Sequence, residues 1–168
     1  MPNSQIQSSI NQYLQLTGKL TDDIFCFATK GNSSVGAHIR HAIDRMNCFI
    51  DGLGVGYINY DLRNRNPQIE TDRMIATEYL REINNFFLEF NKDELDEEIL
   101  VIETLGTTSI PTKMNSTVKR EIGDLIIHNT HHLAIIKVML QSQSKLPEIF
   151  DKDFGKAAST VIYEKSSS

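Results

Sequence analysis

Apolar residues recur at spacings of three and four in four separate stretches of the chain, and this period limits the fold more than any other feature. It is the period of an amphipathic α-helix, which must bury its apolar face against other elements. Four such helices without an internal repeat predict one all-α domain, a four-helix bundle over residues 1–168. The stretches run from about Ser4 to Ala28, Ser34 to Leu53, Thr71 to Asn91 and Ser116 to Ser142.

The segments between these helices are of three kinds. Ser34 and Thr71 carry hydroxyls that predict N-caps for the second and third helices. Residues 57–68 form a polar loop, long enough to indicate a functional or packing role. Residues 99–111 are rich in β-branched side chains, which predicts a short extended segment before the last helix. The final residues, 163–168, are expected to be a disordered tail.

Composition excludes some classes of function. The chain has 168 residues, 40% of them hydrophobic, which suffices for one sizeable core. A formal net charge of −5, with Lys and Arg scattered, argues against a nucleic-acid partner. No run of 18 apolar residues is present, and the first residues lack the pattern of a signal peptide. We therefore expect a cytoplasmic protein without a membrane partner.

The last predicted helix carries two histidines on its apolar stripe. His128 and His132 are four positions apart, about one turn, so both imidazoles can point at a common atom. Each ring has a polar nitrogen that needs a partner in an apolar seam. A divalent metal is one such partner, and a backbone carbonyl or carboxylate on a core histidine is the other. The stripe consists of Glu121, Leu125, His128, His132, Ile135 and Met139.

The second predicted helix offers a third ligand. His38 and His41, three positions apart, share a side of this helix, and the apolar period by itself favours His38. Three protein ligands leave positions for water or substrate, as in catalytic zinc sites. Asn129 follows His128, so the His-Glu-x-x-His motif of a metalloprotease is absent. His131, rotated about 100° from His132, is expected at the surface or beside the site.

The histidine segments resemble the DinB/YfiT-like superfamily. The resemblance covers Gly36–Asp44 (GAHIRHAID), His128–His132 (HNTHH), Tyr60–Arg65 (YDLRNR) and Phe154–Thr160 (FGKAAST). It implies a four-helix bundle with a long crossover, and His41, His128 and His132 as metal ligands. His38 then lies beside the site. The resemblance also implies a homodimer, which a surplus of aromatic residues in the third helix supports: Phe86, Phe87 and Phe90.

Members of that superfamily include metal-dependent thiol S-transferases, so the resemblance implies a small thiol of the bacillithiol type and an electrophile as substrates. Zinc or nickel, and also iron, suit three imidazoles. Arg63, Arg65 and Arg40 are candidates to hold carboxylates, or alternatively form salt bridges with Asp61 or Glu70.

The identity of any acid or base stays open. Asp44, Asp124 and Asn129 are candidate partners of imidazole N–H groups. Two other functions remain: a metal-binding scaffold or stress-response protein without turnover, and a metal-dependent hydrolase.

Overall fold

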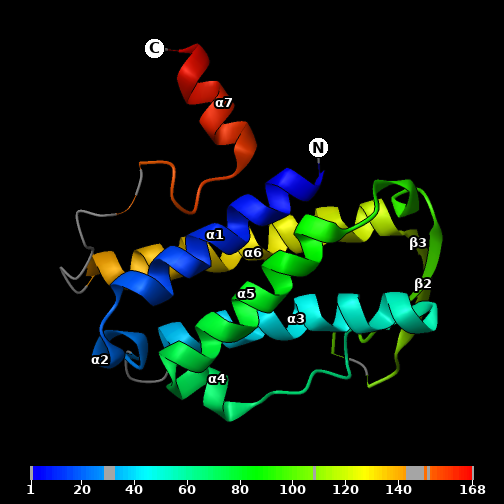
Figure 1. The fold of residues 1–168 in the computed structure, drawn as a ribbon, viewed down its shortest axis with the longest axis horizontal. Helices are drawn as coiled ribbons and strands as arrows, with labels where there is room; N and C mark the ends of the chain where they lie inside the picture. The colour runs from blue at the N-terminus through cyan, green and yellow to red at the C-terminus, as the bar shows by residue number, and fades with distance from the viewer. Residues whose placement is uncertain (1, 29–32, 108, 143–149, 151, 168) are drawn as a thin grey trace.

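The computed structural model describes residues 2–28, 33–107, 109–142, 150 and 152–167. These residues form seven α-helices, one 3-10 helix and three β-strands (Figure 1). In chain order the elements are α1 (Pro2–Lys19), α2 (Asp22–Phe25), α3 (Val35–Val55), β1 (Tyr57–Asn59), α4 (Pro67–Thr71), α5 (Arg73–Glu89), η1 (Lys92–Glu94), β2 (Glu98–Glu103), β3 (Thr112–Thr117), α6 (Val118–Ser142) and α7 (Ala158–Ser166).

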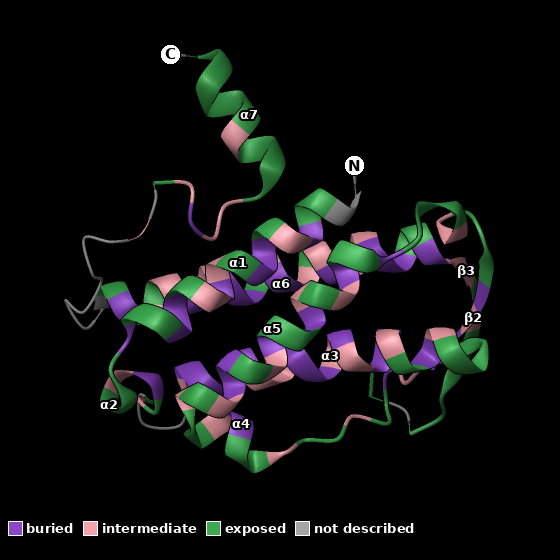
Figure 2. Cartoon of the chain, in the orientation of Figure 1, coloured by how far each residue is buried: buried purple, intermediate pink, exposed green. Residues whose placement is uncertain are grey.

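Four long helices enclose the hydrophobic core. Helix α1 packs against α5 and α6, and α3 packs against the same two helices. Their buried faces turn toward one another, while the outer faces are exposed (Figure 2). The largest fully buried side chains include Tyr13 of α1, Met46 and Phe49 of α3, and Phe87 of α5. The core therefore fixes α3 and α6, the two helices that carry the histidines.

The prediction of an all-α four-helix bundle is wrong, because the chain also builds a three-stranded mixed sheet. Strand β2 lies in the middle, parallel to β1 and antiparallel to β3. Ile58 pairs with Val101, and both are buried. The extended segment predicted over 99–111 contains most of β2, but β1 and β3 lie outside it. The sheet joins the end of α3 to the start of α6, since β1 follows α3 and β3 runs directly into α6.

Helix boundaries agree with the sequence in some places and differ in others. The Ser34 hydroxyl accepts a hydrogen bond from the Ala37 amide at 3.0 Å, which confirms the N-cap of α3. The predicted cap at Thr71 is wrong, because Asp72 caps α5 instead through the Met74 and Ile75 amides. The first helix ends at Lys19, far earlier than the predicted Ala28. A separate short helix, α2, then turns the chain.

The C-terminal segment is helical where a disordered tail was expected. Helix α7 continues to Ser166, so the prediction of disorder from residue 163 is wrong for the described part of that tail. The helix extends away from α1 and α6 in Figure 1. Phe154, just before it, is buried against the core and anchors this end of the chain.

The aromatic residues of α5 pack against one another and against the core of the same chain. Phe87 and Phe90 are buried, and Phe86 packs against both, with ring centroids 5.3 and 5.7 Å away. They therefore give no support to the predicted homodimer, which stays a prediction. Among the described helices, none is long and apolar enough to cross a membrane.

Candidate metal centre

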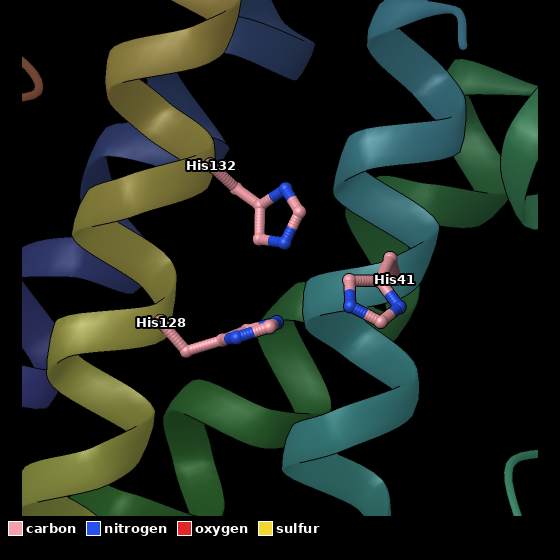
Figure 3. A group of neighbouring side chains, drawn as sticks. All are labelled: His41, His128 and His132. Carbon is pink, nitrogen blue, oxygen red and sulfur yellow. The ribbon is translucent and has the colours of Figure 1, made fainter. Parts of the chain in front are cut away.

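Three histidines from two helices meet between α3 and α6. His41 comes from α3, while His128 and His132 come from α6. Each ring offers one nitrogen as a ligand, and these three nitrogens lie within 4.8 Å of one another. The ring centroids are 4.6 to 4.9 Å apart, and the rings turn toward a shared space (Figure 3). The trio is the set that the family resemblance implies.

The helical period places this trio at the edge of the core. The most buried face of α6 is formed by Ile122, Leu125, Asn129, Leu133 and Ile136. His128 and His132 lie one step around the helix from this face and point at α3. The stripe read from the sequence was therefore rotated slightly from the true core face, and the pair lies in the crease between two helices.

Asn129 belongs to the core rather than to the site. It is fully buried, and its side-chain amide donates to Ser9 Oγ of α1 at 3.0 Å. The backbone carbonyl oxygen of Asn129 accepts a hydrogen bond from the Tyr13 hydroxyl. These contacts hold the back of α6 against α1. The prediction that Asn129 orients an imidazole is therefore wrong.

The three imidazoles are neutral at neutral pH. Burial, followed by the Arg63 guanidinium, lowers the pKa of His41 to about 4. Burial lowers the pKa of His128 to about 3, and Arg45 adds to this effect. Burial, together with repulsion from His128, lowers the pKa of His132 to about 3. Neutral imidazole is the form that ligates metals.

A buried ring nitrogen of the trio has no hydrogen-bond partner in the described part of the chain. Nε2 of His128 is buried and has no hydrogen-bond partner among the described residues. A buried polar atom of this kind is destabilising unless a ligand satisfies it. The observation fits a metal better than a core histidine already bonded to a carbonyl or carboxylate.

His38 contacts the trio from outside. Its Nδ1 lies 3.0 Å from Nδ1 of His132, so one of the two nitrogens donates and the other accepts. If His132 ligates through Nε2, its Nδ1 carries the proton and donates to His38, as a ligating imidazole commonly does to a neighbour. His131 is exposed, with its ring 5.4 Å from that of His132. The apolar period had favoured His38 over His41, and the geometry brings in His41.

The predicted arginines have different surroundings. Arg40 pairs with Asp44 and Glu70 at 3.1 and 3.0 Å, the salt-bridge alternative stated above. Asp44 is occupied by this pair and contacts no imidazole. Arg65 is exposed, with a left-handed backbone at φ 53°. Arg63 alone of these contacts the trio, since its Nη1 lies 2.9 Å from Nδ1 of His41.

The loop that carries Arg63 is tied down at several points. The Asp61 carboxylate accepts hydrogen bonds from the amide and hydroxyl of Thr104, just after β2. The Arg65 backbone lies near the Asp44 carboxyl and, after Arg40, opposes the burial that raises the pKa of Asp44. Asn66 caps α4 through the Gln68 amide at 3.0 Å. Arg63 thus lies in a segment held by hydrogen bonds to Thr104, just after β2, and to the start of α4.

A buried ionic network beside the trio was missed from the sequence. Arg45 lies one turn after His41 on α3 and donates to Glu103 of β2 at 2.6 Å and to Asp124 of α6 at 2.7 Å. Its guanidinium also covers the ring of Tyr60 at 3.9 Å. Although burial acts in the opposite direction, these bonds hold the pKa of Asp124 below its usual value. Asp124 therefore serves Arg45 and not an imidazole.

A second chain of contacts continues the network. Tyr60 donates its hydroxyl proton to Glu121 at 2.9 Å, and Ser116 donates to the other oxygen of the same carboxylate at 2.6 Å. Burial, together with the nearby Glu121 charge, raises the pKa of Tyr60. A sequence signal that could have indicated this network is the presence of charged residues one turn from the histidines, Arg45 after His41 and Asp124 before His128.

Two members of the trio border a cavity. A cavity of about 410 Å³ is lined by His41 and His128, together with Arg45 and Arg63. A second cavity of about 620 Å³ lies beside His38 and is walled by apolar side chains of α6 such as Ile135 and Met139. The exposed side chain of His131 borders both cavities. Volumes in this range accommodate small molecules.

Comparisons with known proteins give limited information. No family model matches the chain, and no solved structure matches it. The chain is 32% identical over 113 residues to a protein of Rhizopus delemar named FK506-binding protein 5. The match covers 66% of this chain but 28% of that protein, so the chain spans less than a third of its relative's length. This similarity assigns neither a family nor an activity.

Proposed function

We propose that this chain binds a divalent metal through His41, His128 and His132, and that it is a DinB/YfiT-like thiol S-transferase acting on a small electrophile. The observation that carries the proposal is the convergence of three neutral imidazoles beside an open cavity. Zinc or nickel fits this all-nitrogen donor set, and iron is a further candidate. The cytoplasm, where thiols stay reduced, is the compartment we propose.

The three histidines and the bound metal have different roles in the proposed reaction. The three imidazoles would hold the metal, and the cavity beside His41 and His128 would admit water or substrate. The bound cation would supply Lewis acidity, which lowers the pKa of a thiol from about 8.5. In the proposed reaction a sulfur–carbon bond forms, the leaving group departs with its electron pair, and the thiol proton passes to solvent.

The open cavities support turnover over a scaffold function. A structural metal site is closed by four protein ligands, whereas the described residues offer three that converge. The cavity beside His41 and His128 is large enough for a small thiol and part of an electrophile. A hydrolase would use the same cavity with water in place of the thiol.

Elemental analysis of purified protein tests the metal site. We expect about one metal ion per chain in the wild type and less than a tenth of that in His41→Ala and in His132→Ala. His131→Ala is the matched control, since this exposed ring lies outside the trio, and it should retain its metal. Unchanged metal content in the first two variants would overturn the site.

A thiol screen then separates the candidate functions. Metal-loaded protein is incubated with cysteine or bacillithiol and 1-chloro-2,4-dinitrobenzene, and thioether formation is followed by absorbance. A rate increase that disappears with the metal supports the transferase. Metal binding without any thiol transfer favours the scaffold, and ester hydrolysis in the absence of thiol favours the hydrolase.

A further inference from the structure

Arg63 is the least satisfied cation at the candidate metal centre. Its Nε is buried without a hydrogen-bond partner among the described residues, and none of the ion pairs in the described part of the chain includes it. Arg40 and Arg45, by contrast, each bind two carboxylates. A half-buried charge is normally paired, so Arg63 has unused capacity for an anion.

The contact between Arg63 and His41 determines where the imidazole proton lies. A guanidinium can only donate, so Nδ1 of His41 must be the acceptor at 2.9 Å. A neutral imidazole that accepts at Nδ1 carries its proton on Nε2. In this arrangement neither nitrogen of His41 is free to ligate a metal.

Metal ligation by His41 therefore requires Arg63 to leave. Ligation through Nε2 places the proton on Nδ1, and two donors would then face each other. Ligation through Nδ1 removes the acceptor directly. Both routes end with the Arg63 guanidinium released into the cavity that also borders His41 and His128.

We infer that Arg63 occupies His41 in the metal-free protein and, once metal binds, becomes the binding group for a carboxylate of a small ligand. This inference rests on the proposed metal site. The planar guanidinium matches a carboxylate with two parallel N–H groups. Arg45 also lines the cavity, but its Nη1 and Nη2 groups already donate hydrogen bonds to Glu103 and Asp124. The ligand class is a thiol that bears a carboxylate.

The inference makes metal and carboxylate binding cooperative. Metal binding frees Arg63 for the carboxylate, and the carboxylate in turn removes a competitor for His41. By thermodynamic linkage, each ligand raises the affinity of the other by the same factor. A neutral thiol lacks the carboxylate and so gains nothing from the freed guanidinium.

The first test is zinc affinity, measured by competition with a chromophoric chelator in buffer free of carboxylates. Arg63→Met removes the competing hydrogen bond, so we expect zinc to bind roughly three- to tenfold more tightly, the equivalent of one hydrogen bond. Arg65→Gln is the matched control from the same loop, because that side chain is exposed, and its affinity should equal that of the wild type. Equal or weaker zinc binding by Arg63→Met would overturn the inference.

The second test uses cobalt-loaded protein and two thiols of similar size, 3-mercaptopropionate and 2-mercaptoethanol. Thiolate-to-cobalt absorption reports binding of each. We expect the wild type and Arg65→Gln to prefer the carboxylate thiol by about tenfold or more, and Arg63→Met to lose that preference. Arg63→Lys keeps the positive charge but lacks the planar guanidinium, and it should retain part of the preference for the carboxylate thiol.

The outcomes separate this inference from the proposed function. If Arg63→Met leaves both zinc affinity and thiol preference unchanged, the inference fails and the metal site stands. If wild-type protein binds no metal, or binds it equally after His128→Ala, both fail. Far-ultraviolet circular dichroism of each variant confirms that affinities are compared between folded proteins.

Discussion

Replacement of Gly36 by alanine tests how closely α3 and α4 approach each other. A Cβ atom at this position would lie 2.1 Å from the backbone oxygen of Glu70 and 2.6 Å from Cε1 of Phe25. Since the first obstacle is backbone, α4 must move away until ordinary contact at 3.4 Å is restored. That movement also pulls Glu70 from Arg40, which it binds at 3.0 Å.

The loss of folding free energy in Gly36→Ala can be bounded. Overpacking of this kind costs about 1 to 3 kcal/mol, and this contact belongs near the upper end because a backbone atom must shift. Alanine regains up to about 1 kcal/mol of helix propensity, which leaves a net loss of about 2 kcal/mol. For a chain of 168 residues this corresponds to a Tm lowered by about 4 to 8 °C.

The matched control is Gly54→Ala on the same helix. No heavy atom lies within 4 Å of a Cβ built there, so only the propensity gain remains and Tm should rise slightly. Thermal unfolding followed by circular dichroism, together with urea titration, compares the two variants. Equal Tm values for Gly36→Ala and Gly54→Ala would refute the close approach of α4 to α3.

Three more predictions concern the site. The pKa values of the three clustered histidines, about 3 to 4, lie below the ~6.5 of an unfolded chain. The unfolded metal-free protein therefore takes up protons first as pH falls. Urea titration should show full stability above about pH 6.5 and a loss on the order of 1 to 3 kcal/mol by pH 5, discounted for partial exposure of the rings; a flat profile contradicts this. Arg45→Met removes the ion-pair partner of Glu103 and leaves Asp124 with the exposed Arg120, and it should cost about 2 to 4 kcal/mol, whereas Arg120→Met, 62% exposed, should cost less than about 0.5 kcal/mol; equal costs in urea would reject the network. His38→Phe should weaken zinc binding roughly ten- to a hundredfold in chelator competition, and an unchanged Kd would show that the contact with His132 does not orient the ligand.

The helices that carry the site were largely predictable because their signals are local. The Ser34 hydroxyl and the apolar period starting at Val35 define the start of α3. The spacing of four between His128 and His132 places both rings on one side of α6, and their centroids are 4.6 Å apart. Capping, period and i,i+4 spacing depend only on residues within a turn or two.

The sheet was not predictable because its strands depend on distant partners. Strand β1 has three residues, and β3 reads Thr112–Thr117 with no apolar alternation. Tyr57 of β1 pairs with Leu100, far along the chain, and such pairing leaves no local pattern. Only β2, with its β-branched residues, resembles a strand in isolation.

The surroundings of the trio were also hard to predict, because they depend on residues that are distant in the sequence. The helical period favoured His38 over His41, whereas the trio contains His41, because a ligand needs only to face the crease between α3 and α6 and not the core. The partners of Arg45 lie 58 and 79 positions away, in β2 and on a different helix. Contacts between such distant residues follow from the tertiary fold alone.

The anchored loop around Arg63 also fixes the timescale of any change at the site. Because Asp61 is held by Thr104 and Asn66 by its cap on α4, we expect the backbone of this segment to stay in place while side chains move. Arg63 can then exchange His41 for another partner by side-chain rotation, an event of roughly nanoseconds, rather than by a loop opening of microseconds or longer. Exchange of the partner of Arg63 should therefore never limit the rate of the proposed reaction.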